Sequence, residues 1–173
     1  MKILITGNLG YVGDDVIRFI QKKNKKIQII GCDLCLYPKT YVKKPNFKIT
    51  KQFHKDYRNL KNEDLKDIFA IVHLAAMSND PIGNLITSET NKINYEGVKK
   101  ITKLAKKNGV KKFIFASSCS VYGSAGSFIK NEKDKTKPLT AYAKSKINSE
   151  KFLKKTPVIQ SYCLRFGTAC GYT

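Results

Sequence analysis

Three tyrosines in this chain are followed by a lysine four residues later, and a pair with that spacing can move a proton. On a helix the two side chains lie on one face, one turn apart. An ammonium group beside a phenol favours the phenolate, so such a tyrosine can act as a base. The three pairs are Tyr57 and Lys61, Tyr95 and Lys99, and Tyr142 and Lys146. Because 33 residues are lysine or arginine and nine are tyrosine, spacing alone does not choose among them.

A glycine-rich loop follows the first apolar segment. "TGNLGYVG" places Gly7, Gly10 and Gly13 after the first expected strand, where the first expected helix begins. Glycines there permit a tight turn and let a pyrophosphate approach the backbone at the helix N-terminus. Asp33 ends the second expected strand, where a carboxylate can bind the ribose hydroxyls of adenosine. The pattern predicts a dinucleotide site that prefers NAD to its 2′-phosphorylated form.

Two acids, Asp14 and Asp15, open the first expected helix. Negative charge is favourable in the first turn because of the helix dipole. Asp14 would also bring a negative charge close to the expected pyrophosphate position. We therefore expect its side chain to point outward; otherwise NAD would bind less tightly than the motif suggests.

Short apolar segments alternate along the chain with longer segments of helical periodicity. The sequence predicts strands over residues 2–6, 27–32, 46–50, 69–75, 112–117 and 158–166, and helices over about 11–23, 84–108 and 140–155. Strand–helix–strand alternation implies a parallel sheet with helices on both faces. The predicted fold class is α/β: a doubly wound parallel sheet (Rossmann fold) of about six strands. With 173 residues, the chain is expected to form one domain with a substantial core.

The formal net charge of +20 would suit an anionic polymer, but only Arg18, Arg58 and Arg165 are arginines. Nucleic-acid sites usually use the arginine fork, and the lysines here are scattered along every segment, so we expect no nucleic-acid partner. No apolar segment is long enough to span a membrane. Cys32 and Cys35 lack a second cysteine pair or histidine cluster, so no metal site is expected. Since "MKILITG" leads directly into a motif, we expect a cytoplasmic protein with reduced thiols.

Further motifs follow in a fixed order. They are "KDYR" at 55–58, "HLAA" at 73–76, "INYEG" at 93–97, "FASSCSVYG" at 115–123, "AYAKSK" at 141–146 and "LRFGTACG" at 164–171. With the glycine loop and Asp33, they make the chain resemble the extended short-chain dehydrogenase/reductase family, whose members include nucleotide-sugar epimerases and dehydratases. The resemblance covers essentially all 173 residues.

The resemblance implies NAD as the cofactor. The residues that it implies for cofactor binding are Gly7, Gly10, Tyr11, Val12, Gly13, Asp33, Asp56, Tyr57, Leu74, Ala75, Ala76, Asn94, Tyr142 and Lys146. Asp56 corresponds to an acid that contacts adenine, and Ala75 and Ala76 to small residues that let the cofactor backbone pass closely. A solvated loop aspartate and a simple polar helix residue are the alternative interpretations of Asp56 and Asn94. His73 is expected to be structural.

The resemblance also separates the three tyrosines. Only Tyr142 follows the fifth expected strand, whose C-terminal end supplies "SSCS", and ligands bind at the carboxyl ends of strands in parallel sheets. The family's catalytic base then corresponds to Tyr142, and the lysine that lowers its pKa to Lys146. Ser118 corresponds to the hydroxyl that holds the reacting oxygen, with Ser117 and Ser120 as alternatives. The implied reaction is transient oxidation of a sugar hydroxyl.

The implied substrate is a nucleotide-linked sugar, and relatives commonly pair as homodimers through the helices expected near 93–108 and 140–155. Residues 1–173 correspond to the NAD-binding domain with its catalytic residues, whereas the family's C-terminal substrate lobe is absent. Thr168 and Cys170 stand where many relatives have Asn and Tyr. A truncated, catalytically silent NAD-binding module is therefore the alternative function. Without the lobe, we expect apolar surface of the sixth strand to be exposed, which favours association.

Overall fold

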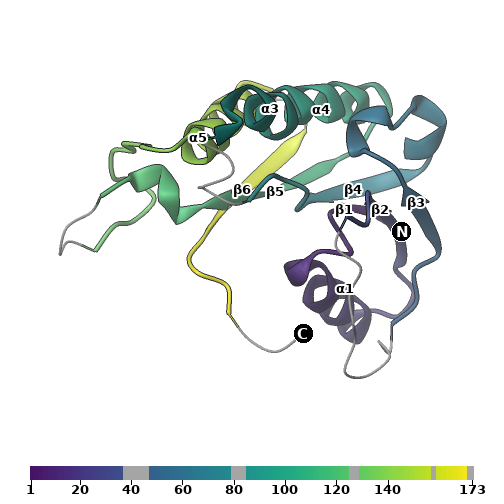
Figure 1. Ribbon diagram of the computed structural model, residues 1–173. Helices are drawn as coiled ribbons and strands as arrows, with labels where there is room; N and C mark the ends of the chain where they lie inside the picture. The colour runs from purple at the N-terminus through teal and green to yellow at the C-terminus, as the bar shows by residue number, and fades with distance from the viewer. Residues whose placement is uncertain (37–46, 79–84, 125–128, 157–158, 171–173) are drawn as a thin grey trace.

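A six-stranded, all-parallel sheet forms the centre of the protein, with strand order β3-β2-β1-β4-β5-β6 (Figure 1). The computed structural model describes residues 1–36, 47–78, 85–124, 129–156 and 159–170. The strands are β1 (Lys2–Thr6), β2 (Gln28–Asp33), β3 (Lys51–His54), β4 (Ile68–His73), β5 (Lys112–Ser118) and β6 (Gln160–Phe166). The predicted doubly wound α/β fold is confirmed.

Helices cover both faces of the sheet. On one face lies α1 (Tyr11–Lys23), and on the other lie α3 (Thr87–Asn91), α4 (Gly97–Lys107) and α5 (Ala141–Lys154) (Figure 1). Short helices join these elements: η1 (Tyr57–Asn59), η2 (Asn62–Leu65), the π-helical η3 (Lys92–Glu96) and η4 (Cys119–Tyr122). None of the helices in the described residues is long and apolar enough to cross a membrane.

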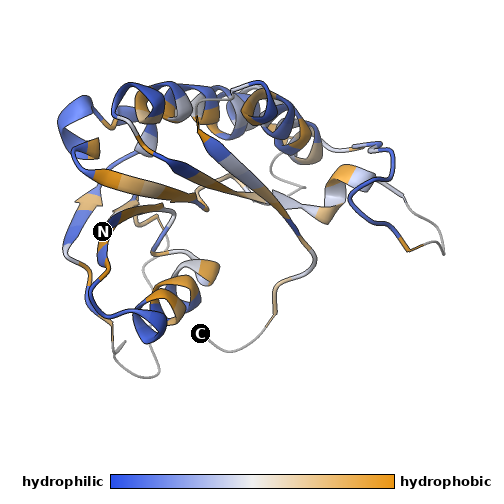
Figure 2. Cartoon of the chain, turned by 180° about the vertical axis from the view of Figure 1, so that it is seen from behind, coloured by the Kyte–Doolittle hydropathy of each residue, from blue (hydrophilic) through white to orange (hydrophobic). Residues whose placement is uncertain are grey.

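The apolar run of β1 is explained by two separate cores. Leu4 belongs to the core beneath α4 and α5, whereas Ile3 and Ile5 belong to the core beneath α1. Alternate side chains of a strand point to opposite faces, so a strand covered on both faces is apolar throughout. Figure 2 shows the resulting apolar colour along the middle of the sheet.

The strand predicted at residues 46–50 is wrong for residues 47–50, and residue 46 lies outside the described residues. The ladder between β2 and β3 begins with Ile30 opposite Lys51, so β3 starts after the expected segment. Phe47 and Ile49 are only partly buried against the α1-side core, without belonging to a strand. Their apolar character reports burial, and burial alone does not require main-chain pairing.

The helix predicted over about 84–108 is interrupted by the π-helical turn η3; residue 84 lies outside the described residues. The Tyr57 hydroxyl donates to the carbonyl of Ile93, and Ser149 Oγ donates to the carbonyl of Asn94 at 3.0 Å. Gly97 makes room for this arrangement, because a Cβ there would lie 2.1 Å from the Tyr57 hydroxyl. A π turn shifts the helical hydrogen bonds by one residue, and here side chains from η1 and α5 use the carbonyls.

The edge strand β6 carries an exposed apolar stripe. Tyr162, Leu164 and Phe166 are 41%, 45% and 39% exposed. They alternate with Cys163, which packs against the core beneath α4 and α5, so they point to the opposite face. Figures 1 and 2 show no described helix over that face of β6. The predicted exposure of apolar surface on the sixth strand is confirmed.

Candidate active site

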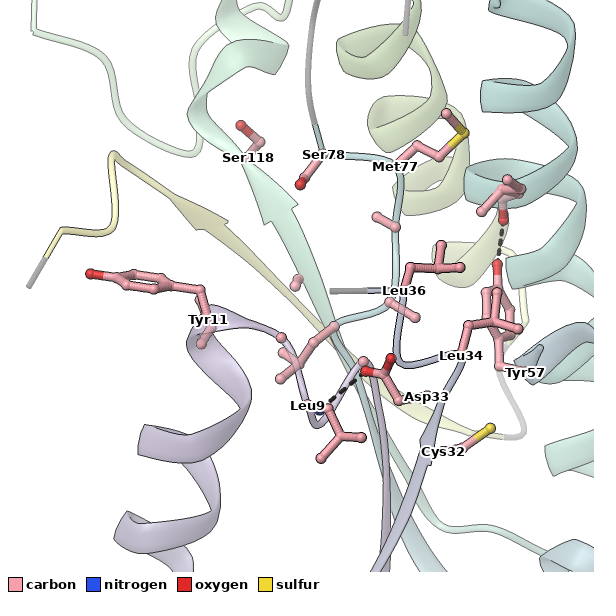
Figure 3. A pocket seen from close by; sticks show the side chains of 18 of the residues that line it. Leu9, Tyr11, Cys32, Asp33, Leu34, Leu36, Tyr57, Met77, Ser78 and Ser118 are labelled. Atoms are coloured by element: carbon pink, nitrogen blue, oxygen red, sulfur yellow. Dashed lines mark hydrogen bonds between the residues drawn. The ribbon is translucent and has the colours of Figure 1, made fainter. Parts of the chain in front are cut away.

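A cleft of about 880 Å³ opens at the carboxyl ends of the strands, where the polar ends of several elements meet (Figure 3). The predicted site residues that line it are Gly7, Gly10, Tyr11, Val12, Asp33, Asp56, Tyr57, Leu74, Ala75, Ala76, Ser118, Tyr142 and Lys146. The glycine loop and Asp33 border the same cleft as the serine, tyrosine and lysine predicted to be catalytic. The fold thus brings together segments separated by more than half of the chain.

Close backbone approach shapes the glycine end of the cleft. Gly7 has a φ of +73°, and a Cβ there would lie 2.6 Å from the backbone nitrogen of Ala75. Only glycine fits both the conformation and the space. Gly13 does not line the cleft; a Cβ at Gly13 would lie 2.1 Å from the carbonyl oxygen of Asn8, so it packs α1 against the turn.

The carboxylate of Asp33 lies beside the glycine loop (Figure 3). Its Oδ2 accepts a hydrogen bond from the backbone nitrogen of Leu9 at 3.1 Å, and its Oδ1 accepts one from that of Cys35 at 2.8 Å. These bonds hold the acid on the wall of the cleft, at the end of β2. A carboxylate there attracts hydroxyl donors and repels an added phosphate.

The expectation that Asp14 points outward is wrong. Asp14 is only 1% exposed, whereas Asp15 is exposed. The buried residues of α1 are Gly13, Asp14 and Ile17, which share one helical face. That face packs against the sheet, and position 14 is therefore turned inward whatever its charge.

Asp56 caps η1 and is held by its neighbour Arg58. The carboxylate accepts from Arg58 Nη2 at 2.6 Å and from its backbone nitrogen at 2.8 Å. Burial opposes ionisation, but the hydrogen bonds from Arg58 outweigh it, and the pKa of the Asp56 carboxyl is lowered. Asp56 thus reaches the cleft as an anion that is already paired.

Two of the three tyrosine–lysine pairs have other roles. Tyr57 is 6% exposed with its hydroxyl bonded to Ile93, and burial raises its pKa, which opposes action as a base. Lys99 lies 5.1 Å from the ring centroid of Tyr95, but its Nζ also donates to Glu96 at 2.9 Å, and neither side chain of the pair lines the cleft. The pair on α5 is the one that faces the cleft with both side chains.

That pair places a buried amine beside a phenol ring. Lys146 is 3% exposed, and its Nζ donates to the carbonyl of Ala116 at 2.7 Å and lies 5.3 Å from the ring centroid of Tyr142. Burial lowers the pKa of Lys146 to about 7. Near neutral pH part of the Lys146 amine is therefore uncharged, and an uncharged amine beside a phenol can accept a proton.

The three candidate serines differ in what their hydroxyls bind. Ser117 Oγ donates to Glu150. Ser118 Oγ accepts from the backbone nitrogen of Ser120 at 3.2 Å and from Ser120 Oγ at 2.9 Å. Two donors to Ser118 leave its own hydroxyl hydrogen available for an oxygen in the cleft.

Asn94 lies behind the cleft wall. Its side-chain oxygen accepts from the backbone nitrogen of Met77 at 2.8 Å, and its side-chain nitrogen donates to the Met77 carbonyl at 3.0 Å. It thus fixes the loop that follows β4. His73, at the end of β4, is 1% exposed; its Nδ1 lies 2.7 Å from Thr6 Oγ1, and burial lowers its pKa to about 3. A neutral, stacked histidine agrees with the structural role expected for it.

Comparison with known proteins identifies the family. Residues 3–173 match the model of the NAD dependent epimerase/dehydratase family. The chain belongs to this family.

Similar proteins include epimerases and a dehydratase. The chain is 29% identical over 188 residues to the Bacillus subtilis protein named uncharacterized UDP-glucose epimerase YtcB, covering 99% of this chain and 57% of that protein. It is 29% identical over 183 residues to the dTDP-D-glucose 4,6-dehydratase of Dictyostelium discoideum, covering 95% and 41%. A solved UDP-N-acetylglucosamine 4-epimerase from Methanobrevibacter ruminantium M1, in complex with UDP-N-acetylmuramic acid, superposes with a TM-score of 0.83 at 25% identity, covering 95% and 54%. The chain spans about half the length of these relatives.

Several cleft residues of this epimerase/dehydratase chain were not assigned to the site from the sequence. They are Leu34, Leu36, Met77, Ser78, Ile93, Phe166, Gly167 and Ala169. Most of them end a strand or follow it within a few residues, at β2, β4 and β6. These residues could have been expected from the rule that ligands bind at the carboxyl ends of parallel strands. That rule does not say which side chains face the cleft.

Replacing Lys146 by methionine should stabilise the protein at pH 7. The unfolded chain holds a fully charged lysine up to a pH of about 10, whereas the folded protein disfavours that charge. We expect the free energy of unfolding to rise by about 2 kcal/mol at pH 7, and the gain to shrink as the pH rises toward 10. Denaturant unfolding at several pH values measures this.

The control is Lys144→Met, an exposed lysine on the same helix, which should change stability little at any pH. A Lys146→Met variant less stable than the parent at pH 7 would contradict the assigned cost of burying the amine.

Proposed function

We propose that this chain binds NAD and carries the catalytic residues of an epimerase or dehydratase that acts on a nucleotide-linked sugar. The observation that carries the proposal is the placement of Tyr142 and Lys146 in the same cleft as the glycine loop and Asp33. A tyrosine base beside a dinucleotide site is suited to remove a proton from a hydroxyl while the attached carbon is oxidised. The names of the similar epimerases and of the dehydratase support the substrate class.

The residues of the cleft fit NAD. Gly7 and Gly10 line the cleft next to the N-terminal end of α1, where a pyrophosphate is favourably bound. Asp33 would bind the adenosine ribose, and the small side chains of Ala75 and Ala76 line the cleft and leave room for the cofactor. When bound, NAD supplies a reversible two-electron acceptor for the sugar carbon.

The proton chemistry is assigned to three side chains. Tyr142 takes the proton of the sugar hydroxyl, and Ser118 donates a hydrogen bond to the same oxygen. Lys146, whose pKa is lowered to about 7 by burial, favours the phenolate of Tyr142 when it is charged. Above that pH the amine and the phenol would share one proton, and below it both groups are protonated and no base is present.

The alternative is an NAD-binding module without turnover. The chain spans about half the length of relatives with named activities. NAD binding together with no exchange of reducing equivalents with any nucleotide sugar would identify this alternative.

The cofactor preference tests the role of Asp33. Isothermal titration should show tighter binding of NAD than of NADP, because a 2′-phosphate would meet the carboxylate. Asp33→Asn keeps a hydrogen-bond acceptor for the backbone of the glycine loop but removes the negative charge. It should narrow the preference for NAD over NADP by about tenfold. Asp15→Asn, on the exposed side of α1, should leave it unchanged. Equal affinity of the parent for both cofactors would reject the assignment.

The catalytic assignment is tested by single-turnover reduction of NAD with UDP-glucose at stoichiometric protein. We expect slow formation of NADH, with a rate that rises through a pH of about 7. Tyr142→Phe should lower the rate by roughly 100-fold or more while NAD binding persists. Tyr95→Phe, which alters a tyrosine outside the cleft, should match the parent. Full activity in Tyr142→Phe would reject Tyr142 as the base.

We also propose that the chain forms homodimers through the exposed stripe of β6. Arg165 is the one charged residue of β6 and is paired with Glu150, so two copies that each carry +20 repel least here. Light scattering should give the mass of a dimer, and Leu164→Lys should reduce it to a monomer. Leu139→Lys, at an exposed site outside β6, should not. A monomeric parent would refute the proposal.

A further inference from the structure

Four side chains from four elements meet beside the carboxyl end of β5. The Glu150 carboxylate accepts hydrogen bonds from Ser117 Oγ, from Arg165 Nε at 3.0 Å and from Arg165 Nη2 at 2.7 Å. Arg165 Nη1 donates to the Tyr122 hydroxyl at 2.8 Å. The side chains of Arg165 and Glu150 are only 16% and 11% exposed. We call Ser117, Tyr122, Glu150 and Arg165 the Glu150 cluster.

The cluster joins β5 to α5 next to the proposed catalytic groups. Glu150 follows Lys146 by one helical turn. Ser117 lies between Ala116, whose carbonyl accepts from Lys146 at 2.7 Å, and Ser118. Two hydrogen bonds therefore tie the strand to the helix side by side, one from Lys146 to Ala116 and one from Ser117 to Glu150. A shift of α5 along β5 would break both.

The hydrogen bonds of Arg165 connect β6 to α5 and also to η4. Tyr122 is the last residue of η4, which begins after Ser118 as its cap. Arg165 precedes Phe166, which lines the cleft. A guanidinium is rigid and planar, so bonds from three of its nitrogens fix α5 and η4 in one orientation relative to β6. One side chain thus relates η4, whose N-terminal cap is Ser118, to the helix that carries Tyr142.

The cluster acts by geometry rather than by charge. Its two charges neutralise each other, and hydrogen bonds to Glu150 raise the pKa of Arg165 above its usual value. The lowered pKa of Lys146 has burial as its cause, with no contribution from Glu150. A partly buried ion pair adds little net stability, but it specifies one arrangement of the groups around it.

We propose that Glu150 and Arg165 are positioning residues that set Ser118 against Tyr142 and Lys146 by locking α5, β5, η4 and β6 in one register. The proposal rests on the proposed function of those three residues. It predicts that the planar guanidinium of Arg165, and not only its positive charge, is required to hold these elements in register.

The test measures the titration of Lys146 by NMR in protein with ¹³C-labelled lysine side chains, the signal being identified by its loss in Lys146→Met. Arg165→Lys keeps the charge but loses the fork, and Glu150→Gln combined with Arg165→Met removes both charges at constant net charge. In both variants α5 loosens from β5 and water reaches the amine. The midpoint of the Lys146 titration should therefore rise by about one pH unit or more. The affinity for NAD should stay within about threefold of the parent, because the glycine loop is unchanged.

Leu153→Ala is the control, since Leu153 lies buried on the same helix among apolar core residues. It should lower the unfolding temperature without moving the Lys146 midpoint. Tyr122→Phe, which removes only the acceptor of Nη1, should give a smaller shift and remains informative if the other variants do not fold. An unchanged midpoint in Arg165→Lys, or an equal shift in Leu153→Ala, overturns the proposal. A parent that binds no NAD would refute the proposed function but leaves the Lys146 titration measurable.

Discussion

An amine taken out of water loses the hydration of its charge, and Lys146 is almost wholly out of water with one hydrogen bond, to the carbonyl of Ala116. The rest of the site depends on this burial. It brings the pKa of the lysine down to about 7, and it requires β5 and α5 to stay in contact. The aromatic rings of Phe115 and Tyr142 lie 4.9 and 5.3 Å from the amine and replace part of the lost water. The proposed base therefore exists only while the surrounding packing holds.

That packing is maintained by main-chain groups that regular structure leaves free. The π turn η3 presents the carbonyls of Ile93 and Asn94 to hydroxyls from η1 and α5. The side chain of Asn94 binds both main-chain groups of Met77. The turn η1, the loop after β4 and helix α5 are thus joined at one irregular turn. Irregular helical turns of this kind are frequent at functional sites.

Charge is distributed unevenly between the surface and the site. The net charge of +20 comes from lysines spread along the chain, whereas Asp56 in the cleft is paired with Arg58, and Glu150 is paired with Arg165 beside the end of β5. Pairing fixes the orientation of each carboxylate. Strand β6 combines low charge with exposed apolar side chains, unlike edge strands that are protected by lysines. The exposed stripe of β6, which unlike the rest of the surface carries little charge, is therefore the surface proposed to form the dimer.

The sequence by itself determined the order of the elements, the parallel sheet and the glycine loop, because these follow from local periodicity and from the spacing of glycines, and its resemblance to a known family selected the candidate catalytic residues. Strands β1, β5 and β6 and helices α1 and α5 lie within two residues of their predicted bounds. Tertiary structure decided three things. Residues 47–50 have the apolar pattern of a strand, but the ladder with β2 begins only at Lys51, since register with β2 decides pairing. Asp14 is buried because the sheet covers its helical face.

The third feature that tertiary structure decided is contact between residues that are far apart in the chain. Neither Glu150 nor Arg165 stands out in the sequence of a lysine-rich protein, and their contact with each other and with Tyr122 arises where α5, β6 and η4 converge. Spacing along the chain reports which side chains share a helix face or a strand face. It does not report which faces of separate elements meet, because that is set by how the whole core packs.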